Sequence, residues 1–150
     1  MKMSTLVVIL AALLIGADDA KEAAIKQDRE KMLGTWIGVS LEQDGTKLED
    51  EAAENMSVTF DAQGKFTVKV EGDEFMTGTY KLDPTKDPKE VDYSWTQDGI
   101  QKKVVAIYKL DGDKLTVCGA EEGDETRPKE FESKSGSRRT QLTYKRDKRN

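Results

Sequence analysis

The side chains of this sequence best suited to hold a small molecule are four aromatic residues and one arginine. The aromatic residues stand in segments where apolar and polar residues alternate, and the arginine begins the RPKEF stretch of a long polar connection. Tyrosine hydroxyls and a guanidinium around an apolar cavity would suit a small amphipathic or anionic ligand. We favour the interpretation in which the same rings fill a solid core, because side chains alone can fill a barrel this small. The candidate residues are Tyr80, Tyr93, Trp95, Tyr108 and Arg127.

Catalytic chemistry has few candidate residues here. The chain contains no histidine, which removes Ser–His and Cys–His nucleophile pairs and the commonest general base near neutral pH. Asp92 lies between Val91 and Tyr93 and points away from both in a strand, so we interpret it as a solvent-facing carboxylate. The acidic cluster EEGDE, residues 121–125, lacks the spaced oxygen ligands of a calcium loop. We therefore expect a protein that is not an enzyme and holds neither metal nor cofactor.

The single cysteine is the remaining reactive group. Cys118 lies in the strand-like stretch LTVCGA. It could be a reactive or intermolecularly paired thiol, but a buried cysteine behaves as a compact hydrophobe, and we favour that interpretation. With one cysteine the chain folds without an internal disulfide.

The first 17 residues have the features of an export signal. Lys2 precedes the uncharged run STLVVILAALLIGA at residues 4–17, a pattern typical of secretory signal peptides. The run is short for a membrane span, which needs roughly 20 apolar residues, and an uncleaved anchor is the alternative. We expect cleavage after Ala17, export to the periplasm or the medium, and no stable membrane insertion afterwards.

The charge balance restricts the partners of the exported chain. The formal net charge of the 150 residues is −5 at neutral pH, and removal of Lys2 with the signal peptide makes it −6. Nucleic acid and anionic lipid surfaces are therefore disfavoured. A small-molecule ligand or a protein of the cell envelope remains. The sequence supports two functions equally, namely a ligand-binding domain, or a structural or protein-interaction domain of the envelope with a solid barrel core.

One helix and eight strands account for most of the remaining chain. DDAKEAAIKQDREKML predicts a helix with Asp19 as N-cap and Glu22 at the capping-box spacing. Short alternating segments separated by Gly/Asp turns predict a meander that closes into an antiparallel up-and-down barrel. Residues 47–55 predict a short lid-like helix, and residues 118–137 a long polar connection. The predicted strands are 35–42, 56–61, 65–71, 75–82, 90–97, 102–110, 114–119 and 139–146.

Several stretches of the chain resemble a known family. GTW at residues 34–36 is similar to the Gly-X-Trp element that opens the first strand of lipocalins, and Arg146 resembles the arginine that packs over that tryptophan. LGTWIGVSLEQDGTKL, GTYKLDPTKDPKEVDYSW, AIYKLDGDKLTVCGA, TRPKEF and LTYKR together resemble a bacterial family of exported lipocalin-like domains expanded in planctomycetes. The resemblance implies the fold and export, with no activity attached. It also implies that Gly34, Trp36 and Arg146 close one end of the barrel, where a guanidinium can stack on the indole.

Strict alternation from Trp36 conflicts with the apolar pattern of the first strand. It would place apolar residues on the outer face, namely Ile37, Val39 and Leu41. Either a β-bulge shifts the register or the N-terminal helix covers this face. We favour the helix, which otherwise has no partner for its own apolar residues.

These expectations divide the chain into four parts. Residues 1–17 form the signal peptide, and residues 18–33 form the N-terminal helix and linker. Residues 34–146 form the lipocalin-like barrel, and residues 147–150 form a disordered tail.

Overall fold

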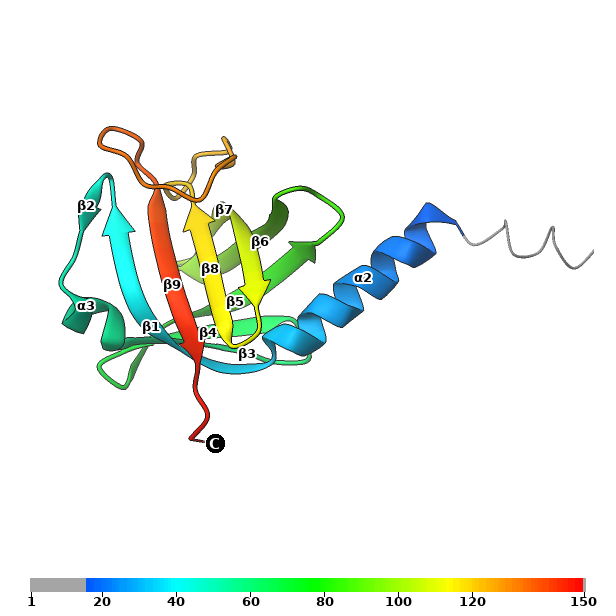
Figure 1. The fold of residues 1–150 in the computed structure, drawn as a ribbon, viewed down its shortest axis with the longest axis horizontal. Helices are drawn as coiled ribbons and strands as arrows, with labels where there is room; N and C mark the ends of the chain where they lie inside the picture. Colours follow the sequence, from blue (N-terminus) through cyan, green and yellow to red (C-terminus); the bar gives the residue numbers. More distant parts are fainter. Residues whose placement is uncertain (1–15, 150) are drawn as a thin grey trace, which may run out of the picture.

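The computed structural model describes residues 16–149, which form an antiparallel β-barrel and two helices (Figure 1). The predicted signal peptide lies outside these residues except for its last two positions. The eight predicted strands are confirmed, each within two residues of its predicted bounds. The barrel strands are β1 (Gly34–Gln43), β3 (Met56–Phe60), β4 (Lys65–Val70), β5 (Asp73–Asp83), β6 (Lys89–Gln97), β7 (Ile100–Asp111), β8 (Lys114–Gly119) and β9 (Thr140–Arg146).

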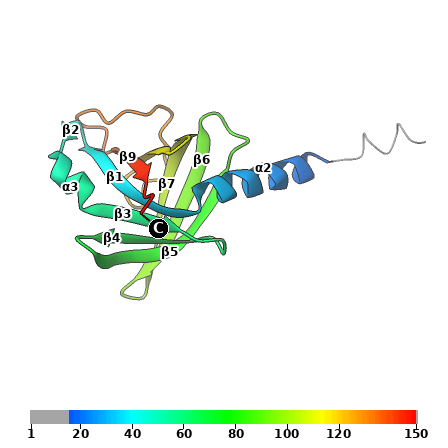
Figure 2. The same ribbon diagram turned by 60° about the horizontal axis from the view of Figure 1, so that its bottom comes forward.

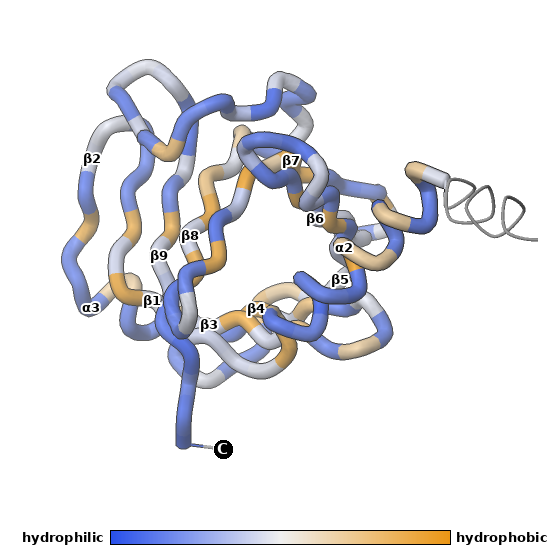
Figure 3. The backbone as a smooth tube through the Cα atoms, turned by 45° about the vertical axis from the view of Figure 1, so that its right-hand side comes forward, coloured by the Kyte–Doolittle hydropathy of each residue, from blue (hydrophilic) through white to orange (hydrophobic). Residues whose placement is uncertain are grey.

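The sheet closes because its first and last strands pair. Each barrel strand pairs antiparallel with the next one along the chain, and β1 also pairs with β9. The two-residue strand β2 (Thr46–Lys47) pairs with the end of β1 in a small hairpin. Figure 3 shows the strands surrounding a common interior. Eight strands enclose a space that side chains can fill or that can hold one small ligand.

Helix α2 (Ala17–Met32) closes one end of the barrel with its last turns. The predicted N-cap is wrong, because Gly16 precedes the helix without a side-chain cap and Asp19 lies in the first turn. A carboxylate there still faces the positive end of the helix dipole. Met32 is fully buried in the barrel core, whereas the first two turns of α2 are exposed and project away from the barrel (Figure 2).

Trp36 and Arg146 lie in contact at this closed end. Trp36 is fully buried, and its Nε1 donates a hydrogen bond to the Met32 carbonyl at 2.9 Å. The guanidinium carbon of Arg146 lies 4.2 Å from the Trp36 ring centroid, and its Nη1 donates to the Leu33 carbonyl at 2.8 Å. Gly34 takes a φ of 106°, which favours glycine. The arginine therefore connects the indole to the carbonyls at the end of α2.

A buried carboxylate also fixes α2 to the barrel. Asp28 is 3% exposed, and its Oδ2 accepts hydrogen bonds from Tyr108 Oη at 2.7 Å and from Lys89 Nζ at 2.8 Å. A buried carboxylate is costly unless its charge and its lone pairs are both satisfied. These two contacts therefore favour one orientation of the helix on the barrel end.

A β-bulge in β1 resolves the conflict in the predicted register. The pairing of β1 with β9 shifts between Gly38 and Ser40. Beyond the bulge Leu41 points inward and is 7% exposed, while Val39 lies outside and is 40% exposed. The prediction that the N-terminal helix covers the outer face of this strand is therefore wrong. The helix lies at the barrel end, and one extra residue restores the apolar pattern.

The short helix α3 (Asp50–Glu54) forms within the segment predicted as a lid. It packs against β1 so closely that a Cβ at Gly38 would lie 2.0 Å from the Ala53 carbonyl oxygen. Ala53 is fully buried by this contact. Glycine at position 38 therefore provides the space in which α3 docks.

Part of the polar connection between β8 and β9 covers the outer faces of β7 and β8. The Cys118 thiol donates to the Glu132 carbonyl at 3.5 Å, and Lys109 Nζ lies 4.8 Å from the Phe131 ring centroid. Cys118 is fully buried, as predicted. Burial raises the pKa of its thiol.

We expect Cys118 to react slowly with thiol reagents in the folded protein. The side chain is fully buried and its raised pKa reduces the reactive thiolate fraction. Intact-mass measurements of maleimide labelling, with and without urea, check this expectation. Rapid stoichiometric labelling in the absence of urea would contradict it.

Candidate ligand cavity

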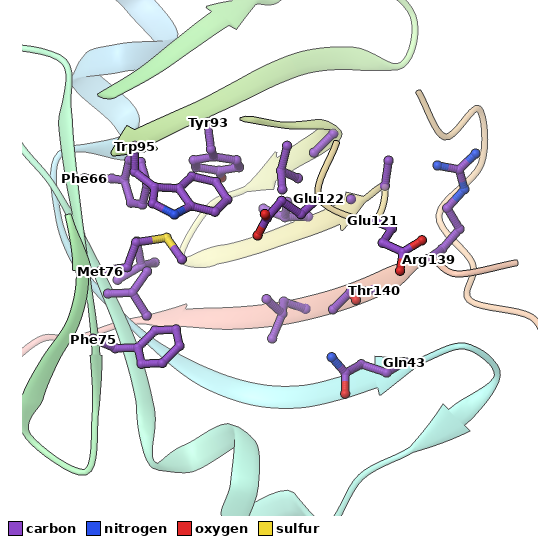
Figure 4. Close-up of a pocket in the computed structure, with 18 of the residues that line it drawn as sticks. Gln43, Phe66, Phe75, Met76, Tyr93, Trp95, Glu121, Glu122, Arg139 and Thr140 are labelled. Atoms are coloured by element: carbon purple, nitrogen blue, oxygen red, sulfur yellow. The ribbon is translucent and has the colours of Figure 1, made fainter. Parts of the chain in front are cut away.

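A cavity of about 930 Å³ lies inside the barrel, and neither α2 nor α3 contributes to its described lining. The lid-like role predicted for residues 47–55 is therefore wrong, and so is a completely solid core. The lining has two unlike sides (Figure 4). The apolar side includes Phe66, Phe75, Met76, Tyr93 and Trp95. The polar side includes Gln43, Glu121, Glu122, Arg139 and Thr140.

Strand β6 brings two of the five predicted contact residues to the cavity. Tyr93 and Trp95 are two positions apart, so both point inward from the same strand face. The Tyr93 ring packs edge-on against Phe66 with a centroid distance of 5.1 Å. Burial raises the pKa of the Tyr93 phenol far above its ordinary value, so the hydroxyl stays neutral.

A glycine allows the aromatic rings of the apolar side to approach the sheet. A Cβ at Gly78 would lie 2.1 Å from the Ser94 carbonyl oxygen, 2.9 Å from Trp95 Cβ and 3.0 Å from a ring carbon of Phe66. The predictions omitted this residue. The sequence feature that could have indicated it is a glycine inside the strand pattern MTGTY. Such a glycine often marks a position where another group approaches the backbone closely.

Phe75 is a second residue of the apolar side that the sequence predictions did not include. The pairing of β4 with β5 shifts after Val68, so Phe75 is an extra residue on β5. It lines the cavity and is nevertheless 69% exposed. A bulge can turn a side chain out of strict alternation, and nothing in the period-two pattern indicates where such an insertion falls.

Tyr80 and Tyr108 do not line the cavity, which corrects two predicted contact residues. Both point inward, but they lie toward the end that α2 closes. Tyr80 is 3% exposed, packs on Phe60 with a centroid distance of 4.9 Å, and donates to the Asp61 carbonyl at 3.2 Å. Tyr108 is 1% exposed, and its hydroxyl donates to Asp28. Their hydroxyls therefore have partners within the protein.

Arg127 corrects a third prediction, because it lies on the outer face of the barrel. Its Nη1 donates to the Ala106 carbonyl at 2.8 Å. Its Nη2 lies 2.7 Å from Asp92 Oδ1, and its Nε lies 3.3 Å from Glu90 Oε1. Asp92 points away from the interior as predicted, but it is paired with an arginine. Arg127 anchors the polar connection to β6 and β7.

The charges on the polar side of the cavity largely compensate one another. Arg138 Nη1 lies 3.4 Å from Glu121 Oε2, and Lys102 Nζ lies 2.8 Å from Glu122 Oε1. Arg139 Nη1 donates to a backbone carbonyl at 2.6 Å. This side therefore presents both signs of charge, without the single cationic centre that Arg127 would have supplied.

Two further properties concern the described residues alone. Within residues 16–149, no three His, Cys, Asp or Glu side chains are grouped closely enough to hold a metal ion. Over the same range, helices of the length and apolar character required to span a bilayer are absent.

The match to a family model agrees with the barrel. No curated protein matches the chain. The crystal structure of a DUF4847 family protein from Bacteroides vulgatus is similar, with a TM-score of 0.48 and 13% sequence identity, over 83% of this chain and 99% of that one. The family model described as "Lipocalin-like domain" matches residues 32–117, from the end of α2 into β8. The chain therefore belongs to the lipocalin-like domain family.

Proposed function

We propose that this chain is an exported lipocalin-like domain that binds a small amphipathic molecule inside its barrel. The observation that carries the proposal is the two-sided lining of the 930 Å³ cavity. An apolar body fits the aromatic side, and a polar or charged group fits the opposite side, where it keeps polar neighbours. The role is binding rather than catalysis, since the acidic groups Glu121 and Glu122 each lie in an ion pair.

The location of Arg127 narrows the class of ligand. The sequence indicated an anionic ligand because the Arg127 guanidinium could bind it inside the barrel. In the structure this guanidinium pairs with Glu90 and Asp92 outside the barrel. The remaining cations at the cavity are matched by carboxylates. An amphipathic molecule with a large apolar part is therefore the ligand we favour.

A fluorescent apolar probe tests the binding function. We expect N-phenyl-1-naphthylamine to bind saturably and to increase its emission. Met76→Glu places a carboxylate on the apolar side and should weaken binding about tenfold or more, because a buried unpaired charge is costly. Thr79→Glu is the matched control, since Thr79 lies on the same strand and is exposed. Absence of saturable binding, or equal affinities of the two variants, would contradict the proposal.

The export part of the proposal rests on the first 17 residues and on the resemblance to exported bacterial lipocalin-like domains. Protein recovered from the periplasm or medium of its host should begin near Asp18. Intact mass and N-terminal sequencing measure this directly. A soluble cytoplasmic form that keeps Met1 would contradict export.

A further inference from the structure

We propose that the Trp95 indole N–H recognises an uncharged hydrogen-bond acceptor, such as a ketone, ester or amide carbonyl, on the bound ligand. This inference rests on the proposed binding function and adds the chemical group that the apolar side selects. It concerns one atom, Trp95 Nε1.

The buried N–H of Trp95 has no hydrogen-bond partner among residues 16–149. The residue is 8% exposed and lines the cavity. The other indole of the chain differs, because Trp36 Nε1 donates to the Met32 carbonyl at 2.9 Å. Buried tryptophan N–H groups normally have a partner, and an unmade hydrogen bond there is destabilising. A ligand in the cavity can supply the missing acceptor once the side chain that covers this N–H moves.

A flexible side chain covers this donor on the side that faces the cavity. In Figure 4 the nitrogen edge of Trp95 faces Met76, with Phe66 on the same side of the cavity. A methionine thioether is only a weak acceptor, and its unbranched side chain changes conformation readily. Displacement of Met76 would expose the N–H to the ligand without moving a strand.

The surroundings favour a neutral acceptor over a carboxylate. The charged lining residues Glu121 and Arg139 lie across the cavity from Trp95 in Figure 4. Glu122 lies between them and the aromatic side, and its carboxylate is paired with Lys102 Nζ at 2.8 Å. A carboxylate against the aromatic side would lose its hydration in exchange for a single N–H. A neutral carbonyl loses much less hydration free energy at this position and can accept the same hydrogen bond. The ligand therefore orients with a neutral carbonyl at Trp95 and its most polar group on the opposite side.

A matched pair of naphthalene probes tests this assignment. One probe is 6-propionyl-2-(dimethylamino)naphthalene, which carries a ketone, and the other has a propyl group in place of the propionyl group. Trp95→Phe keeps an aromatic ring and removes the N–H. We expect the variant to bind the ketone about tenfold more weakly than the unaltered protein does, with a change of less than about twofold for the propyl probe. Phe66→Leu is the control, since loss of apolar contact should weaken both probes by a similar factor.

A second measurement starts from the unaltered protein, so its first outcome does not depend on the folding of a variant. The infrared carbonyl stretch of the bound ketone should shift to lower frequency than in an apolar solvent, and Trp95→Phe should remove the shift. An unshifted carbonyl in the unaltered protein overturns the inference. Equal weakening of both probes by Trp95→Phe also overturns it while leaving cavity binding intact. Failure of both probes to bind the unaltered protein would refute the proposed function as well.

Discussion

Replacing Trp36 with alanine is expected to lower the free energy of unfolding by about 3 to 5 kcal/mol, the range for deleting a large buried aromatic side chain. Trp36 is fully buried at the barrel end and donates a hydrogen bond to the Met32 carbonyl. The substitution removes the apolar contacts and leaves that carbonyl without its donor. It also separates the end of α2 from the barrel core.

Arg146, which stacks on Trp36, can be compared with Arg149, an arginine three residues further along the chain. Arg146→Ala removes the guanidinium that stacks on the indole and donates to the Leu33 carbonyl, so we expect a loss of about 1 to 3 kcal/mol. Arg149→Ala should change stability by less than about 0.5 kcal/mol, because that side chain is 80% exposed and its ion pair is with nearby Asp147.

Urea unfolding of the two arginine variants measures this difference. The emission of Trp36, recorded in a Trp95→Phe background, should also change in Arg146→Ala because the stacked cation is lost. Equal and negligible losses for Arg146→Ala and Arg149→Ala, with unchanged emission, would mean that the arginine does not support the closed end. The cation–π contact would then contribute nothing measurable to closure.

Alkaline pH should destabilise the fold strongly above about pH 10. Burial raises the pKa values of Tyr93, Tyr108 and Tyr144 well above their ordinary value. Above pH 10 the unfolded chain loses protons from these tyrosines, while the folded protein retains them. The folded state therefore binds more protons, and stability falls as pH rises. The expected slope approaches about 1.4 kcal/mol per pH unit for each tyrosine, or roughly 4 kcal/mol for three.

Urea unfolding at a series of pH values up to about 11.5 checks the direction and slope. Tyr144→Phe should reduce the alkaline slope by up to about 1.4 kcal/mol per pH unit, because one protonation difference between the folded and unfolded states is removed. Ultraviolet absorbance of tyrosinate should rise together with unfolding rather than before it. Ionisation of these tyrosines in the folded protein near pH 10, or an unchanged slope in Tyr144→Phe, would contradict the explanation.

The sequence by itself determined the local elements of this protein. Period-two alternation and Gly/Asp turns act over a few residues, so all eight barrel strands could be located, including β8 at its observed bounds of Lys114–Gly119. The burial of Cys118 followed from its strand setting. The inward direction of Tyr93 and Trp95 followed from their spacing, because neighbouring strand positions point to opposite faces. The single two-residue strand β2 was too short to leave a pattern.

Only the tertiary structure decided which inward residues line the cavity. Tyr80 and Tyr108 alternate like Tyr93, but α2 closes their end of the barrel, and Asp28 reaches Tyr108 across 80 positions of sequence. The position of Arg127 on the outer face depends on how the long connection lies against β6. Such contacts depend on where distant segments meet after the sheet closes, and local periodicity carries no information about that. The bulge that inserts Phe75 has the same origin, since its register is set by the pairing of β4 with β5.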